Sequence, residues 1–147
     1  MTLSELEEMW KVDSLINEND EMIAMEALRV GQLHSKYLGI WMQVKKQLRQ
    51  AEGELLTLKR YKRIWYTGKM SEEDLTLLKW SQYLGKEVLK VSMDSVLSED
   101  ADVIKQGDKY EYLKITVGAL ESILKAISSR GWDIKNAIAM IRFTGGE

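Results

Sequence analysis

The chain contains no cysteine, no proline and only one histidine in 147 residues. Without cysteine it forms no disulfide, no thiolate metal site and no cysteine nucleophile, which is typical of proteins from a reducing compartment. The single histidine, His34, leaves no paired-histidine spacing for a metal ion, and no glycine-rich loop is present to hold phosphate. We therefore predict no catalytic residues, no metal and no cofactor, and a protein that is not an enzyme.

Long apolar runs are also missing. No stretch approaches the roughly 20 consecutive apolar residues of a membrane helix, and the acidic start is unlike a signal peptide. We expect a single domain, residues 1–147, in the cytoplasm with no membrane partner. The lack of proline and the 45% of hydrophobic residues favour an all-α fold, because no backbone N–H donor is lost to a proline ring.

An apolar seam with heptad spacing is the strongest pattern in the sequence. Its residues follow each other at alternating distances of four and three, and only His34 and Lys62 among them are neither apolar nor aromatic. The seam consists of Ile23, Ala27, Val30, His34, Tyr37, Trp41, Val44, Leu48, Ala51, Leu55, Leu58, Lys62 and Trp65.

The seam predicts one long helix over residues 22–68, with Gly68 as its end and Gly53 as the likeliest break. Such a helix is roughly 65–70 Å long at about 1.5 Å per residue. A compact chain of this size has a radius of gyration of only about 15 Å. We therefore expect a second copy to cover the seam, and the chain to assemble as a homo-oligomer.

Shorter helices are predicted on both sides of the seam. Residues 1–20 form an acidic arm whose helix is capped by Thr2 or Ser4 and ends in a polar turn at residues 17–20. A second helix is expected from Ser71 to about Leu84. Residues 85–97 follow no clear period, and we expect an extended or irregular segment there.

The C-terminal region, residues 98–147, predicts helices that begin with Ser98 as N-cap. Heptad spacing returns in Val103, Tyr110, Leu113, Val117, Leu120, Leu124 and Ile127, with Gln106 at one seam position. Arg130 and Gly131 are expected to close this helix, and Asp133 to cap a last one. A helix of about ten residues is marginal alone, so its stripe of Ile134, Ile138 and Ile141 should dock on a partner surface.

Charge is strongly segregated along the chain although the net charge is only −2. Residues 1–28 carry eight acidic residues against one lysine, whereas residues 44–69 carry eight cationic residues against two glutamates. Such segregation suits local recognition of an anion.

Cationic and aromatic side chains alternate in residues 58–69, which indicates single-stranded DNA as the partner. Cations neutralise phosphates, and aromatic faces stack on unpaired bases without regard to sequence. The alternative is a solvated helix face with core aromatics, and Trp65 on the seam fits that role. The predicted DNA-binding residues are Lys59, Arg60, Tyr61, Lys62, Arg63 and Tyr66, with a second group of Lys45, Lys46 and Arg49.

Several ordered blocks resemble the UvsY family of recombination mediators from T-even-type bacteriophages. They extend from about residue 23 to the C-terminus, and none is a strong motif alone. The blocks are residues 33–38, the basic segment ending in Tyr66, Thr67 and Gly68, then Val96, Leu97, Ser98, Asp100, Asp102, Val103 and Lys105, and finally Ala126, Ile127, residues 129–131, Ile134 and Lys135.

The resemblance implies a helical, non-enzymatic mediator that forms a hexamer or heptamer ring in the infected bacterial host cell. It implies binding of single-stranded DNA, loading of the phage recombinase and displacement of the single-strand binding protein. The family's Lys-x-Arg pair for DNA falls on Arg60 and Lys62, with the two cations in reversed order. The family's C-terminal assembly region falls on Ile134, Ile138 and Ile141.

A coiled-coil scaffold or adaptor that binds only protein partners is the competing interpretation. It accounts for the seam, the acidic arm and the lack of catalytic groups without nucleic acid. Tryptophan fluorescence that a single-stranded oligonucleotide quenches, and that salt restores, separates the two.

Overall fold

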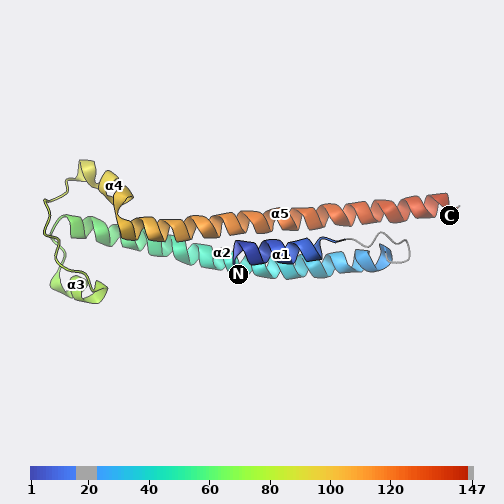
Figure 1. The fold of residues 1–147 in the computed structure, drawn as a ribbon, viewed down its shortest axis with the longest axis horizontal. Helices are drawn as coiled ribbons and strands as arrows, with labels where there is room; N and C mark the ends of the chain where they lie inside the picture. The colour runs from blue at the N-terminus through green and yellow to red at the C-terminus, as the bar shows by residue number, and fades with distance from the viewer. Residues whose placement is uncertain (16–22, 146–147) are drawn as a thin grey trace. The chain divides into compact units, whose positions relative to one another are not determined.

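A computed structural model describes residues 1–15 and 23–145, and all regular structure in these ranges is helical (Figure 1). The predicted turn at residues 17–20 and the predicted first residue of the long helix, Met22, lie outside the described residues. The all-α prediction is confirmed. The helices are α1 (Leu3–Asp13), α2 (Ile23–Tyr66), α3 (Glu72–Leu78), α4 (Lys90–Glu99) and α5 (Ala101–Thr144).

The predicted long helix is α2, which spans 44 residues. It continues through Gly53, so the predicted break there is wrong. A glycine inside a helix costs only about 1 kcal/mol relative to alanine, and burial of Ala51 with partial burial of Leu55 outweighs that cost. Gly68 ends the helix as expected, with a φ of 73° that glycine adopts without strain.

The C-terminal region is one 44-residue helix, α5, and not two. The predicted stop at Arg130 and Gly131 is wrong, because Arg130 turns its side chain toward the end of α1 instead of closing its own helix. The predicted start at Ser98 is also wrong. Asp100 is the N-cap, and its Oδ1 accepts a hydrogen bond of 3.0 Å from the backbone N–H of Val103.

The apolar seam of α2 is covered by α5 of the same chain, which corrects the expectation that a second copy covers it. Gln106 of the α5 seam donates to the carbonyl oxygen of Ala51 at 3.4 Å, and the indole of Trp41 donates to Glu121 at 3.2 Å. Because α5 has 44 residues, as α2 does, it is long enough to cover the apolar seam of α2. The buried residues of the two predicted seams are Tyr37, Val44, Ala51, Lys62, Val103, Val117, Leu120 and Ile127.

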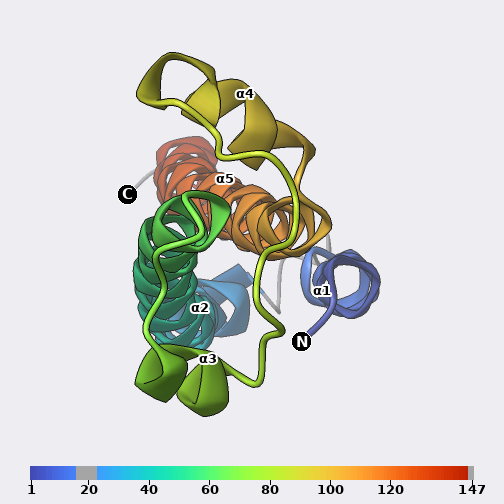
Figure 2. The ribbon, with the colours of Figure 1, turned by 90° about the vertical axis from the view of Figure 1, so that its left-hand side faces the viewer.

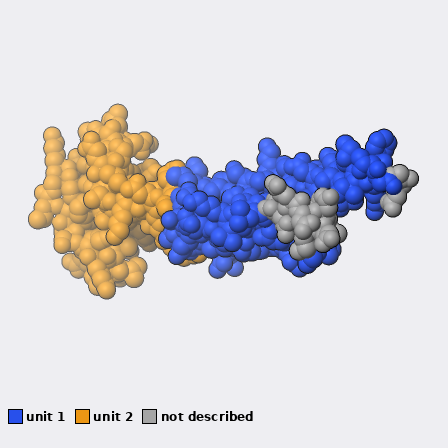
Figure 3. Space-filling view, turned by 45° about the vertical axis from the view of Figure 1, so that its right-hand side comes forward, with its two compact units in different colours: residues 1–46, 113–147 blue, residues 47–112 orange. Residues whose placement is uncertain are grey.

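The chain divides into two compact units, each containing part of α2 and part of α5 (Figure 3). Unit 1 comprises residues 1–46 and 113–147, and unit 2 comprises residues 47–112. The expectation of a single domain stays a prediction. The candidate DNA-binding segment, residues 59–66, lies wholly within unit 2.

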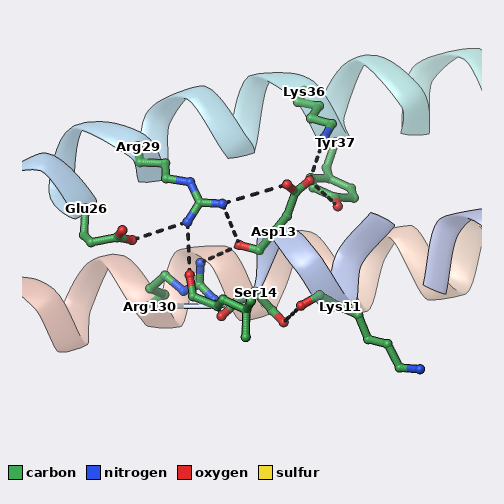
Figure 4. Close-up of polar contacts among 9 residues, drawn as sticks. Lys11, Asp13, Ser14, Glu26, Arg29, Lys36, Tyr37 and Arg130 are labelled. Carbon is green, nitrogen blue, oxygen red and sulfur yellow. Dashed lines mark hydrogen bonds and ion pairs between the residues drawn. The ribbon is translucent and has the colours of Figure 1, made fainter. Parts of the chain in front are cut away.

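Unit 1 holds α1 against α2 and α5 through Asp13 at the end of α1 (Figure 4). Its carboxylate accepts from Lys36 at 2.6 Å and from the Tyr37 hydroxyl at 2.8 Å. Arg130 of α5 donates to the carbonyl oxygen of Asp13 at 3.2 Å. At the other end Thr2 is the N-cap in a capping box with Glu5, so of the two predicted caps Thr2 is the correct one.

Unit 2 places α3 and α4 around the end of α2 (Figure 2). α3 is shorter than predicted and ends at Leu78, because Lys79 adopts a left-handed φ of 58°. The prediction of an irregular segment over residues 85–97 is only half right, since residues 85–89 are non-helical but α4 begins at Lys90. Met93 and Leu97 of α4 are buried with Val103, and Leu55 and Leu58 of α2 pack against them. This apolar cluster is what makes the segment helical.

Candidate nucleic-acid interface

Two arginines of the predicted basic segment are exposed on α2. Arg60 and Arg63 are three residues apart and so share one face of the helix. Arg60 lies over the ring of Tyr61 at 5.3 Å, and Arg63 pairs with Asp94 at 3.4 Å. Half of the Arg63 side chain and nearly all of the Asp94 side chain are exposed, so this pair is weak and opens readily to a phosphate. Both guanidinium groups are available to an anion.

Lys62 has a different environment from the other cations of the segment. Only 8% of its side chain is exposed, and its Nζ lies 3.2 Å from Asp100 Oδ2 and 2.8 Å from Asp102 Oδ2. The same Nζ lies 5.0 Å and 4.7 Å from the ring centroids of Trp65 and Trp80. A cation enclosed in this way has its charge neutralised inside the protein. In this structure the ammonium group of Lys62 pairs with two carboxylates, and its predicted contact with phosphate stays a prediction.

Asp100 is the residue on which these contacts converge. Burial by itself would raise the pKa of its carboxyl group, but hydrogen bonds from Tyr66, from the Val103 N–H and from Lys62, together with the Lys62 charge, outweigh burial and lower the pKa from its usual value. Burial and the hydrogen bond to Asp100 also raise the pKa of Tyr66. Asp100 thus remains a carboxylate that joins the end of α2 to the start of α5.

The predicted aromatic residues divide into two roles. Trp65 and Tyr66 belong to an aromatic cluster with Trp80 and Tyr83, with ring centroids of Trp65 and Tyr83 4.9 Å apart and those of Tyr66 and Tyr83 5.2 Å apart. Tyr66 is partly buried in this cluster, and its predicted role in stacking on bases stays a prediction. Tyr61 is half-buried beside Arg60 and remains the candidate for stacking.

Sequence reasoning missed Trp80 and Tyr83 as members of this cluster. The indole of Trp65 donates to the carbonyl oxygen of Ser81 at 2.7 Å, which brings the segment after α3 back onto α2. No local signal marks such a contact across 16 residues. Lys79, with its left-handed φ of 58°, lies between Trp65 and Ser81 at the end of α3.

The second basic group lies earlier on α2 and is exposed. Lys45 and Lys46 belong to unit 1 and Arg49 to unit 2, and Lys45 lies 5.8 Å from the ring centroid of Trp41. None of the three is buried, which leaves their charges free to meet solvent or an anion. Their predicted role in DNA binding stays a prediction.

A groove of about 760 Å³ borders the basic segment in unit 2. It begins at Arg63 on α2 and ends on the first turns of α4. Its lining combines aliphatic side chains with three cations and two carboxylates. The lining residues are Arg63, Ile64, Thr67, Lys69, Glu87, Val88, Leu89, Lys90, Met93 and Asp94.

The side chains of the predicted assembly stripe become more exposed from Ile134 to Ile141 along α5. Ile134 is buried at 7% exposure and, with Ile138, lines a hollow of about 350 Å³ beside Val30 of α2. Ile134 therefore packs inside the chain, whereas Ile141 is 42% exposed. Other exposed apolar side chains at this end of α5 are Trp132, Met140 and Phe143.

Within residues 1–15 and 23–145, no group of three or more His, Asp or Glu side chains is arranged to hold a metal ion. Among the same residues, no helix combines the length and the hydropathy needed to cross a lipid bilayer.

Known proteins show the same sequence pattern and the same fold. The family model for "Recombination, repair and ssDNA binding protein UvsY" matches residues 9–147. The recombination protein UvsY of Enterobacteria phage T4 is 27% identical over 147 residues, which is the full length of both chains.

Two crystal structures of the bacteriophage T4 recombination mediator protein UvsY superimpose closely on this chain. One has a TM-score of 0.84 at 27% identity and covers 99% of this chain and 98% of its own. The other has a TM-score of 0.81 at 28% identity and covers 97% and 99%. With a family match over nearly the whole length and this agreement in fold, the chain belongs to the UvsY family of recombination, repair and single-stranded-DNA-binding proteins.

Proposed function

We propose that this recombination mediator holds single-stranded DNA on the basic segment of α2, with Arg60 and Arg63 as the principal phosphate contacts and Lys59 beside them. The observation that carries this assignment is the exposure of both arginines on one helix face, next to the half-buried ring of Tyr61. Cations provide affinity for the phosphates, and the tyrosine face stacks on a base without selecting sequence. Lys45, Lys46 and Arg49 extend the cationic surface of α2.

Lys62 acts in this proposal as a positioning residue and not as a phosphate ligand. Its ion pairs with Asp100 and Asp102 tie the basic segment to the start of α5. Loss of Lys62 would weaken DNA binding indirectly, by releasing the segment that carries Arg60 and Arg63. Tyr66 supports the segment in the same way through Asp100.

Assembly multiplies the weak contacts of one copy. We propose a homo-oligomeric ring, a hexamer or heptamer, with Ile138 and Ile141 and the exposed apolar side chains near them at the interface between copies. Closed symmetry prevents open-ended filaments. Repetition of the basic segment raises avidity through effective concentration. Ile134 is buried beside Ile138 and contributes to the packing under this surface.

The mediator acts on other proteins rather than by catalysis. We propose that the DNA-bound ring loads the phage recombinase onto the strand and helps displace the single-strand binding protein, in the cytoplasm of the infected bacterial host. No catalytic residue and no cofactor takes part. A ring that holds the strand mainly by its phosphates leaves the bases that it does not contact accessible to the incoming recombinase.

The salt dependence of DNA affinity tests the phosphate contacts. Fluorescence anisotropy of a labelled oligothymidylate should give an affinity that falls with salt, with a log–log slope of about −0.7 for each phosphate neutralised. Changing Arg60 and Arg63 to Gln should reduce the slope by about 1.4 per copy. Lys86→Gln, which removes an exposed cation outside the segment, is the matched control. A flat titration of the wild type contradicts the proposal.

The protein-only scaffold makes the opposite prediction. Trp65 and Trp80 lie beside Lys62, so they report on the basic segment. Oligothymidylate should quench their fluorescence at low salt, and high salt should restore it. A scaffold without affinity for nucleic acid leaves the fluorescence unchanged at both salt concentrations.

A further inference from the structure

We propose that the groove between the end of α2 and the start of α4 is a nucleotide subsite, which holds a base with its deoxyribose on the groove floor and a phosphate at its rim. This inference rests on the proposed function and deepens it, because it assigns a second part of the single strand to a second set of residues. The groove measures about 760 Å³, within the roughly 300–1,000 Å³ typical of small-molecule sites.

The groove continues the proposed phosphate-binding face. Arg63, Ile64 and Thr67 line it from α2, and Arg60 lies one helical turn before them on the same face. A strand that contacts Arg60 and Arg63 therefore enters the groove without changing direction. Arg63 belongs to both surfaces.

The charges of the groove match a phosphate. Its lining contains three cations against two carboxylates, Glu87 and Asp94. The lining therefore carries one more positive than negative charge, and Arg63 lies 3.4 Å from Asp94. Lys69 and Lys90 are exposed and carry flexible stems, so they reach a phosphate that passes the rim.

The floor of the groove is aliphatic. Met93 is buried at 6% exposure, while Ile64 and Leu89 are exposed at 39% and 65%. No aromatic ring is among the lining residues, so a base there is held by apolar contact with its face and with the sugar, and not by stacking. Contact of this kind does not distinguish one base from another, which suits a mediator that acts on any sequence.

Removal of bases separates this subsite from simple phosphate binding. Anisotropy is measured with an oligothymidylate and with the same backbone carrying internal abasic sites. The abasic strand keeps every phosphate but cannot fill the groove floor. Wild-type affinity should fall about fivefold on the abasic strand, as expected for the loss of apolar contact of the size of a methylene group or more.

The variant combines Ile64→Gln with Leu89→Ser. Gln is compatible with a helix, and Ser is a favoured residue at the N-cap position that Leu89 occupies, so both changes preserve local structure. The variant should bind the oligothymidylate about fivefold more weakly and should keep only the part of the preference over the abasic strand that stacking on Tyr61 provides. Leu84→Ser, which changes a leucine with 92% exposure outside the groove, is the control and should behave as wild type.

Each outcome decides between clear alternatives. If the variant keeps the wild-type preference for strands with bases, the bases lie elsewhere and the subsite is wrong. If the variant keeps full DNA affinity but loses binding to the recombinase, the groove is a docking site for protein. If wild-type protein binds both strands equally while Arg60→Gln with Arg63→Gln still weakens binding, the phosphate contacts stand and the subsite fails. Absence of any wild-type binding contradicts the proposed function itself.

Discussion

The hydroxyl of Tyr66 donates a hydrogen bond of 2.5 Å to Oδ2 of Asp100 and so joins the last residue of α2 to the N-cap of α5. Lys62, one turn earlier on α2, pairs with the same carboxylate oxygen at 3.2 Å. A single side chain therefore caps one long helix and fixes the end of the other. The basic segment of α2 is held in place by this carboxylate.

The first prediction concerns Lys62. Lys62→Met keeps the length and apolar stem of the side chain but leaves the carboxylate of Asp100 without its cation. Breaking a buried ion pair on one side is strongly destabilising, and we expect the free energy of unfolding in urea to fall by about 3–5 kcal/mol. Lys46→Met, at an exposed position on α2, should leave the unfolding midpoint unchanged. If Lys62→Met and the wild type unfold at the same urea concentration, the ion pair of Lys62 with Asp100 does not stabilise the fold.

The second prediction concerns acid. The pKa values of Asp13 and Asp100 are both lowered in the folded protein, since hydrogen bonds from Tyr37 and Tyr66 and from lysines outweigh burial. In the unfolded chain an aspartate titrates near pH 3.9, so on acidification the unfolded state takes up protons first. Stability should be constant above about pH 5 and fall as the pH drops below about 4.

Circular dichroism melts between pH 7 and pH 3 measure this loss. Asp100→Asn should lower the melting temperature at pH 7 and flatten its dependence on acid, because one of the two linked carboxylates is gone. A variant with the same acid dependence as the wild type would assign the loss to other groups.

The third prediction concerns Arg130, which donates to the backbone carbonyl oxygens of Asp13 and Ser14 and lies 5.5 Å from the ring of Trp10. Arg130→Ala leaves the last carbonyl groups of α1 without these partners. We expect faster amide exchange throughout α1 than in the wild type, with exchange in α3 unchanged. Lys125→Ala, at an exposed position on α5, is the control. Protection of α1 in both variants would mean that its apolar contacts suffice.

The fourth prediction concerns assembly. Ile141→Asp places a charge on a residue that is 42% exposed and should shift the sedimenting species toward smaller forms. Ile141 is preferable to Ile138, which is only partly exposed and lines the hollow beside Val30. Ile115→Asp changes an apolar side chain of the same helix with 58% exposure and should leave the assembly intact. If Ile115→Asp reduces the size of the assembly and Ile141→Asp does not, the interface lies toward the middle of α5.

Prediction from the sequence succeeded where periodicity over many residues carried the signal. The two heptad seams placed α2 and most of α5, and eight of their residues are buried. Helix ends were less predictable, because more than one residue near each end is a suitable cap. Ser98 and Asp100 are both good N-caps, and Asp100 is the cap in the structure because it also binds Tyr66 and Lys62, which are distant in sequence.

The candidate site shows the same division. The density of cations and aromatic residues over 59–66 identified the segment, and Arg60 and Arg63 are exposed there as expected. Lys62 and Tyr66 face inward, and no local pattern distinguishes them from their neighbours. Their partners, Asp100 and Trp80, lie 38 and 18 residues from Lys62 along the chain.

The amino-acid sequence alone determined that this protein is helical, that one long heptad helix is followed by a C-terminal region with the same spacing, and that its positive charge is concentrated on the long helix. These properties follow from spacing and composition, which act within a single helix. The tertiary structure decided that α5 rather than a second copy covers α2, and which cations of the basic segment remain free. Both depend on contacts between distant segments, where burial and pairing with a carboxylate determine whether a positive charge faces solvent.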